Sequence, residues 1–141
     1  MIQISHGDDL NLDPPISLHA EKIVKETFNY KNISDYDLSL VFVSDEYLSD
    51  LKKKYFKMNQ YTDVIAFRLN EYGTPFVEGE VYISLPRAKE NAKIFDEPYS
   101  KEVSRLIIHG CLHLIGLKDK THIEKENMTN NEDAILKLIN W

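Results

Sequence analysis

The sequence contains a single cysteine, Cys111, so no disulfide can form within the chain. This usage fits a reducing compartment. Long apolar runs are also missing. The longest candidate, residues 106–116, falls short of the roughly 18 residues that suggest a membrane span, and it carries two histidines. The first ten residues show neither the basic nor the apolar region of a signal peptide. These absences predict a cytoplasmic protein with no membrane partner.

Positive charge is in short supply as well. The formal net charge is −6, whereas nucleic-acid-binding proteins usually present a basic face. The densest cationic cluster consists of Lys52, Lys53, Lys54 and Lys57, and its simplest interpretation is a solvated helix end. The composition therefore argues mildly against a protein covered with phosphate-binding charge, and we expect no DNA partner. A local basic patch stays compatible with the sequence.

What is present is the composition of an ordinary globular protein. Hydrophobic residues make up 43% and charged residues 28% of the 141 residues, a length that supports one domain with a real core. No repeat, low-complexity segment or Gly/Ser-rich linker divides the chain. We therefore predict a single domain over residues 1–141.

Periodicity and turn signals predict the secondary structure. After an irregular N-terminal arm, we expect helices at about 17–30, 44–54, 86–95, 100–115 and 121–141, and strands at about 37–44, 61–69 and 79–84. Ser100 is the expected cap of the fourth helix, and Thr121 with Glu124 has the spacing of a capping box. The fourth helix is apolar nearly all round, which predicts a buried central helix. The fold class is α+β, with helices packed on a small mixed sheet of three or four strands.

The central helix carries the most informative pattern. His109 and His113 are four residues apart, so they lie about 40° apart on the helix surface and one turn above the other. Their imidazoles can chelate one metal ion. Cys111 points about 200° away from His109 and should belong to the core. The alternative is a pair of core histidines bonded to backbone carbonyls, but burying two polar rings without a purpose is costly.

A third ligand must come from beyond the helix. Gly116 can end the helix in a left-handed conformation, which lets the chain carry Asp119 back toward the histidines. His122 is the rival third ligand. Three protein ligands with an open position form the catalytic type of zinc site, so we predict one Zn²⁺ at His109, His113 and Asp119.

The spacing also fits the metzincin peptidase pattern HExxHxxGxxD. In those peptidases the glutamate after the first histidine is the general base, and here that position is Gly110. General base catalysis contributes about 10²–10⁴-fold. A zinc peptidase is therefore the least favoured interpretation, unless another carboxylate reaches the site.

Three blocks of sequence resemble one known family. They are HGCLHLIG at residues 109–116, TDVIAF at 62–67 and GEVYIS at 79–84. Their order and spacing are similar to those of the YbeY family, and the resemblance extends over residues 38–132. It implies a metal-dependent, single-strand-specific endoribonuclease that acts in rRNA maturation at the 16S 3′ end and in ribosome quality control. Its implied partners are rRNA and a ribosomal subunit or assembly factors.

Two positions depart from the family pattern. Asp119 stands where the family has a third histidine, and Phe56 stands where it has an arginine linked to RNA function. The general base stays open: Asp63 and Glu80 are candidates, with a structural role at a strand end as the alternative. Arg105 lies one helical turn before His109 and is a weak candidate for a catalytic role in the same cleft, with a charge that simply extends to solvent as the alternative. A different class of function, a ribosome-assembly binding factor with a structural metal, is the main competing hypothesis.

Overall fold

The structure is a computed structural model, and it describes residues 1–6, 17–56 and 62–140. The elements in these ranges follow the order β1 (Ile2–His6), α1 (Ser17–Tyr30), β2 (Asp35–Val43), α2 (Asp45–Phe56), β3 (Val64–Arg68), β4 (Phe76–Ser84), α3 (Leu85–Ile94), α4 (Tyr99–Leu114) and α5 (His122–Leu138). The α+β prediction is confirmed. None of the described helices combines the length and the apolar character that crossing a membrane requires.

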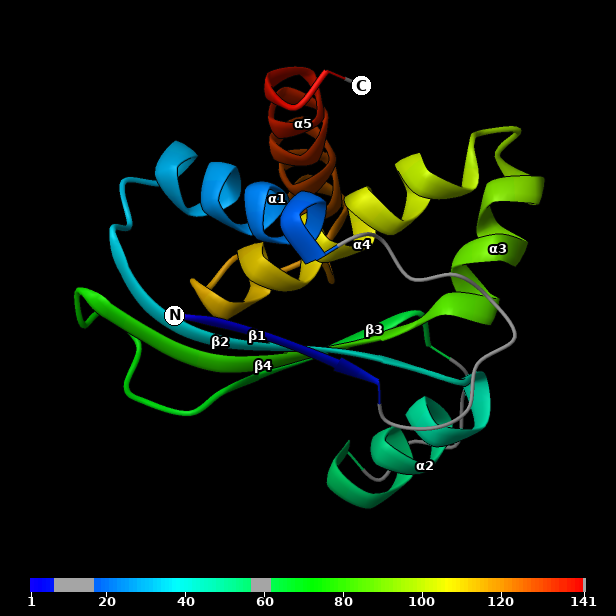
Figure 1. The fold of residues 1–141 in the computed structure, drawn as a ribbon, viewed down its shortest axis with the longest axis horizontal. Helices are drawn as coiled ribbons and strands as arrows, with labels where there is room; N and C mark the ends of the chain where they lie inside the picture. The colour runs from blue at the N-terminus through cyan, green and yellow to red at the C-terminus, as the bar shows by residue number, and fades with distance from the viewer. Residues whose placement is uncertain (7–16, 57–61, 141) are drawn as a thin grey trace.

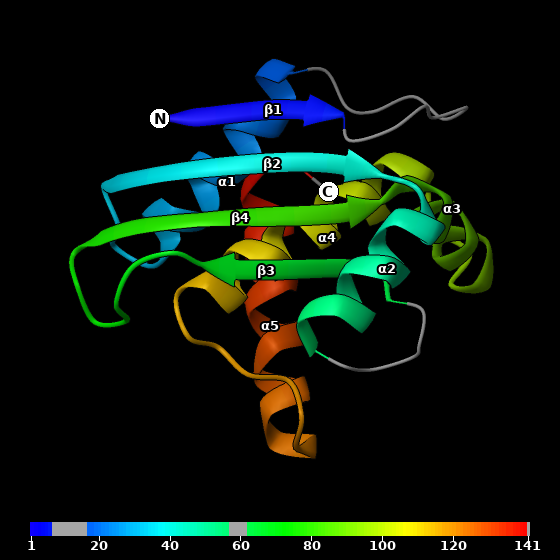
Figure 2. The same ribbon diagram turned by 90° about the horizontal axis from the view of Figure 1, so that it is seen from below.

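The four strands form one mixed sheet in the order β1-β2-β4-β3. Figure 2 shows this order, with β3 running against its neighbours. β2 pairs in parallel with β1 and β4, and β3 pairs antiparallel with β4. In β4 the side chains alternate between buried and partly exposed, as expected for a strand with one wetter face. Val81 on its buried side packs in the main core.

Helices cover both faces of the sheet unequally. Figure 1 shows α1, α4 and α5 on one face and α2 on the other. The main core lies under α1, α4 and α5, while a small second cluster of Val43, Leu48 and Ile65 lies under α2. Leu40 and Phe42 of β2 join the main core and the next residue, Val43, joins the second cluster, so the C-terminal end of β2 is buried on both faces. Helix α4 packs against α1, α3, α5, β3 and β4, which makes it the central helix.

Two local predictions were wrong. The N-terminal segment that was expected to be irregular contains strand β1. The five residues of β1 are too few to show a strand pattern, and the strand forms by pairing with the distant β2. The expected cap Ser100 lies inside the first turn of α4, because the helix begins at Tyr99 and its N-cap is Pro98, two residues before the expected cap. The Pro98 carbonyl accepts bonds from the N–H groups of Lys101 and Glu102.

Other local predictions are confirmed. The Thr121 hydroxyl accepts a bond from the Glu124 N–H, and the Glu124 carboxylate accepts one from the Thr121 N–H. Gly116 has a φ of 102°, the left-handed conformation that ends α4. Three residues named in the predictions lie outside the described residues: Lys57, Tyr61 at the start of the predicted strand 61–69, and Trp141.

Candidate metal centre

Helix α4 approaches the sheet closely at Gly110. A Cβ atom placed there would lie 2.5 Å from Val81 Cγ1 and 3.2 Å from Val64 Cγ2. The contact with Val81 is closer than packed carbon atoms allow, and the contact with Val64 is tight, so a glutamate here would force Val81 or the helix to shift. The close packing of α4 on the sheet therefore disfavours the peptidase base at this position.

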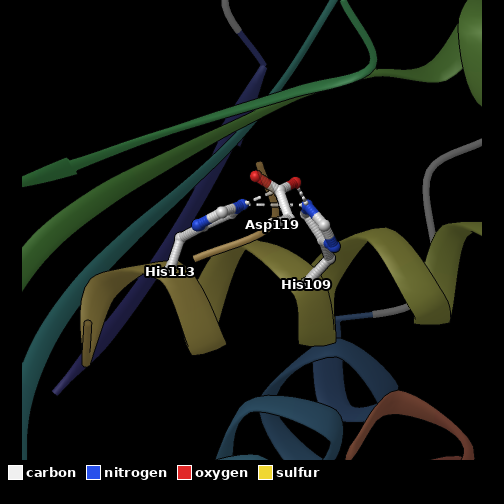
Figure 3. A group of neighbouring side chains, drawn as sticks. All are labelled: His109, His113 and Asp119. Carbon is white, nitrogen blue, oxygen red and sulfur yellow. Dashed lines mark hydrogen bonds and ion pairs between the residues drawn. The ribbon is translucent and has the colours of Figure 1, made fainter. Parts of the chain in front are cut away.

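Three predicted ligands lie together above this contact. The Nε2 atoms of His109 and His113 are 3.0 Å apart, and their rings are nearly perpendicular, at 80°. The Asp119 Oδ2 atom lies 3.2 Å from each of these nitrogens. Figure 3 shows the two rings rising from one side of α4 with the Asp119 carboxylate between them. His122, the rival ligand, is exposed at the start of α5 and is not part of this group.

The turn after α4 places Asp119. The N–H groups of Gly116 and Leu117 donate to the carbonyls of His113 and Leu112, which closes the last turn of the helix. Arg68 of β3 donates from Nη1 to the Leu114 carbonyl at 2.7 Å. This bond satisfies one of the free carbonyls at the helix end, and it ties the turn to the sheet.

The outer nitrogen of each ring has a partner that fixes its orientation. His113 Nδ1 lies 2.9 Å from the Leu117 carbonyl oxygen, and His109 Nδ1 lies 2.6 Å from the Glu132 Oε2 atom. Both partners accept hydrogen bonds, so both Nδ1 atoms carry the proton in the neutral rings. The Nε2 lone pairs and the Asp119 oxygen then point at one another.

This arrangement fits a divalent cation. Ligands about 2.0–2.1 Å from a tetrahedral zinc ion are roughly 3.3 Å apart, close to the 3.0–3.2 Å separations among the three donor atoms. Two imidazoles and one carboxylate are a common donor set for Zn²⁺. The hydrogen-bonded outer nitrogens resemble those of histidine metal ligands generally.

Sequence reasoning missed Glu132. It lies on the buried face of α5 and is only 5% exposed. Its Oε1 atom accepts a bond from Arg105 Nη1 at 2.9 Å, while Arg105 Nη2 pairs with Asp133 at 2.8 Å. An acidic residue within the apolar stripe of α5, four positions after the buried Met128, was the available signal.

Several pKa values are shifted around the site. Burial lowers the pKa of His109, but the hydrogen bond and charge of Glu132, with the charges of Asp119 and Asp63, outweigh it and raise the pKa above its ordinary value. Burial raises the pKa of Glu102. Burial also raises the pKa of the Cys111 thiol, which is fully enclosed in the core as predicted.

The candidate catalytic residues lie in different surroundings. Asp63 accepts a hydrogen bond from Asn91 Nδ2 at 3.1 Å, and it lines the same surface as His109 and Asp119. Arg105 forms ion pairs with the carboxylates of Glu132 and Asp133.

Two depressions meet at two of the three ligands, His109 and Asp119. The first has a volume of about 860 Å³, and we call it the lysine cleft; residues of β3 form part of its lining. Among the described residues, its charged and aromatic lining residues are Lys52, Phe56, Asp63, Tyr72, His109, His113, Lys118, Asp119 and Lys120. The second, about 880 Å³, we call the acidic hollow; its charged lining residues are Asp63, Glu97, Glu102, Arg105, His109, Asp119, Lys125, Glu132 and Asp133. Asp63, His109 and Asp119 border both.

Comparison with known proteins gives consistent results. A sequence model of the family described as "Endoribonuclease YbeY" matches residues 4–140. A relative named endoribonuclease YbeY from Christiangramia forsetii is 40% identical over 102 residues, which cover 72% of this chain and 70% of the relative. One of the same name from Halalkalibacterium halodurans is 34% identical and covers 82% and 80% of the two chains. One from Treponema denticola is 31% identical and covers 96% and 90%.

A solved structure has a similar fold. The solution structure of TM1509 from Thermotoga maritima superposes with a TM-score of 0.62 and 24% sequence identity, covering 97% of this chain and 90% of that one.

Proposed function

Because the chain belongs to the endoribonuclease YbeY family, we propose that it is a metal-dependent endoribonuclease that cleaves single-stranded RNA. The observation that carries the proposal is the convergence of His109, His113 and Asp119 within an open depression. Three ligands at a surface leave a position for substrate or water, as catalytic zinc sites do. We propose Zn²⁺ as the ion.

The chain's own residues divide the work around that position. A bound divalent ion supplies Lewis acidity to a phosphodiester and to a nearby water. His109 and His113 would hold the ion through Nε2 and Asp119 through its carboxylate, while Glu132 keeps the His109 ring in its orientation through Nδ1. We propose that Asp63 is the carboxylate that accepts a proton, and its position at the border of the same opening, outside the ligand group, supports this role. Asp63→Asn should lower kcat while leaving the bound metal unchanged, and equal kcat values would refute this role.

Family membership supports a proposal for the biological setting. We propose that one domain over residues 1–141 acts in the cytoplasm on rRNA, at the 16S 3′ end, and in ribosome quality control. Its partners would be a ribosomal subunit or assembly factors. The acidic net charge of −6 is compatible with this setting, because the lysine cleft concentrates positive charge at the site.

The decisive comparison uses His113→Ala and, as a matched control, His122→Ala. Metal content, circular dichroism and cleavage of a single-stranded oligoribonucleotide are measured for both variants and the wild type. We expect His113→Ala to lose metal and with it most of the RNA cleavage, because the ion supplies the Lewis acidity, and His122→Ala to resemble the wild type.

Two results would redirect the proposal. A wild type that binds RNA but does not cleave it, with unfolding of His113→Ala, would support an assembly factor with a structural metal. Cleavage of casein, lost in His113→Ala, would support the peptidase alternative.

A further inference from the structure

An exposed aromatic side chain stands at the rim of the lysine cleft. Phe56, the last residue of α2, is 43% exposed and lines the cleft together with His109 and His113. Its neighbour Tyr55 is more exposed, at 57%, but is not among the lining residues. The two adjacent rings therefore differ in whether they face the candidate metal centre.

The sheet supports Phe56 from behind. Its ring stacks on that of Phe67 in β3, with centroids 5.8 Å apart and an interplanar angle of 23°. Phe67 in turn meets the ring of Tyr82 in β4 edge-on at 5.8 Å. Strands carry both supporting rings, so one side of the Phe56 ring rests on the sheet. Such support lowers the entropic cost of stacking another ring against Phe56.

Positive charge accompanies this aromatic surface. Lys52 lies one helical turn before Phe56, and its Nζ atom is 4.8 Å from the Phe56 ring centroid. Lys118 and Lys120, from the turn that carries Asp119, also line the cleft. A ligand that suits this surface has a flat apolar ring and a negative charge within a few ångströms of it.

An unpaired nucleotide has this chemistry. Proteins that bind single strands combine a positive groove for the backbone with aromatic rings on which bases stack. Bases locked in a duplex offer no free face for such stacking. The neighbouring acidic hollow offers carboxylates instead, which would repel a phosphate backbone.

We propose that the lysine cleft is the substrate-strand subsite, in which the base of an unpaired nucleotide next to the cleaved phosphate stacks on Phe56 while Lys52 neutralises that nucleotide's backbone phosphate. This inference rests on the proposed function, and it adds a stacking subsite that makes the site selective for single strands.

The test is an abasic scan with fluorescence anisotropy. A labelled single-stranded oligoribonucleotide is compared with a series that each lack one base, in the wild type, Phe56→Leu, Phe56→Tyr and Tyr55→Leu. Base stacking on an aromatic side chain changes affinity by about 5- to 150-fold per base. We expect one abasic position to weaken binding to the wild type by this amount and to have little further effect on Phe56→Leu.

The controls separate stacking from stability. Phe56→Tyr should behave as the wild type, because it keeps the ring. Tyr55→Leu should also keep the abasic penalty, although it removes a neighbouring ring that packs edge-on against Phe67 at 5.4 Å.

Failure of this inference can be told from failure of the proposed function. If the wild type cleaves RNA but the abasic penalty persists unchanged in Phe56→Leu, the stacking subsite is wrong and the endoribonuclease proposal stands. If the wild type binds single-stranded RNA with the Phe56-dependent penalty but does not cleave it, the subsite stands and the activity is wrong. Equal affinity for duplex and single-stranded RNA would overturn the subsite.

Discussion

The lysine cleft and the acidic hollow share a border but differ in charge. Among the described residues, the cleft has Lys52, Lys118 and Lys120 and only the two border carboxylates. The hollow adds four more carboxylates against one arginine and one lysine. Both depressions have nearly the same volume. Volume therefore does not distinguish which depression receives the substrate, whereas the charge of the lining residues does.

The difference in charge indicates that the two depressions have different roles. On the acidic side, Glu132 bonds to the outer nitrogen of His109 and is itself held by Arg105. On the lysine side, the approach to the ligand group is lined by cations and exposed rings. A chain with a net charge of −6 can thus serve a polyanionic substrate, because its positive charge is local.

The largest effect should come from the acidic side. Glu132→Gln removes the charge that faces His109, and the loss of such a partner typically weakens metal affinity by 10–100-fold. Zinc affinity of the metal-free protein, measured by competition with a chelating dye, tests this. Asp133→Asn is the matched control, because it removes the other carboxylate bonded to Arg105 without a contact to a ligand. Equal affinities for the two variants would contradict the role given to Glu132.

Charge removal on the lysine side should act on substrate instead of metal. Lys118→Gln and Lys120→Gln should each raise KM for single-stranded RNA several-fold and leave zinc affinity unchanged. Each lysine that neutralises a phosphate contributes about 0.7 to the slope of log affinity against log salt concentration. Lys125→Gln, in the acidic hollow, should leave KM and slope as they are. An equal change in Lys125→Gln would mean that the two sides do not differ.

The smallest predicted effect concerns the free-energy cost of burying the Glu102 carboxyl in the acidic hollow. Glu102 is 5% exposed, and burial raises its pKa. The folded protein then holds this proton more tightly than the unfolded chain, so the stability from the protonated carboxyl is lost as pH rises through the folded pKa. Glu102→Gln keeps an oxygen for Asn91 and should raise Tm by a few degrees at pH 7 and less at pH 4. A Tm difference independent of pH would contradict this account.

The sequence predicted the parts that depend on local pattern. The period of α4, the positive φ at Gly116 and the capping box at Thr121 are all set by neighbouring residues. The same helical geometry placed Cys111 in the core and His109 beside His113. Asp119 could be proposed from sequence because it is only six residues from His113.

The parts that depend on distant pairing were not predictable in the same way. Strand β1 is stabilised by pairing with its parallel neighbour β2. Its five residues are too few for the hydrophobic pattern to predict a strand. Glu132 reaches His109 across 23 positions, so only the packing of α5 on α4 shows the contact. The two depressions likewise combine residues from α2, β3, α4 and α5, and their opposite charges appear only when these elements are assembled.

The central claim is that His109, His113 and Asp119 bind one metal ion together. X-ray absorption spectroscopy of the Zn²⁺-loaded protein tests it most directly, because zinc–sulfur and zinc–nitrogen distances differ by about 0.2–0.3 Å. We expect one zinc ion per chain with two imidazoles and further oxygen ligands, unchanged in His122→Ala and Cys111→Ala and altered in Asp119→Ala. A third imidazole lost in His122→Ala, or a sulfur ligand lost in Cys111→Ala, would contradict the account.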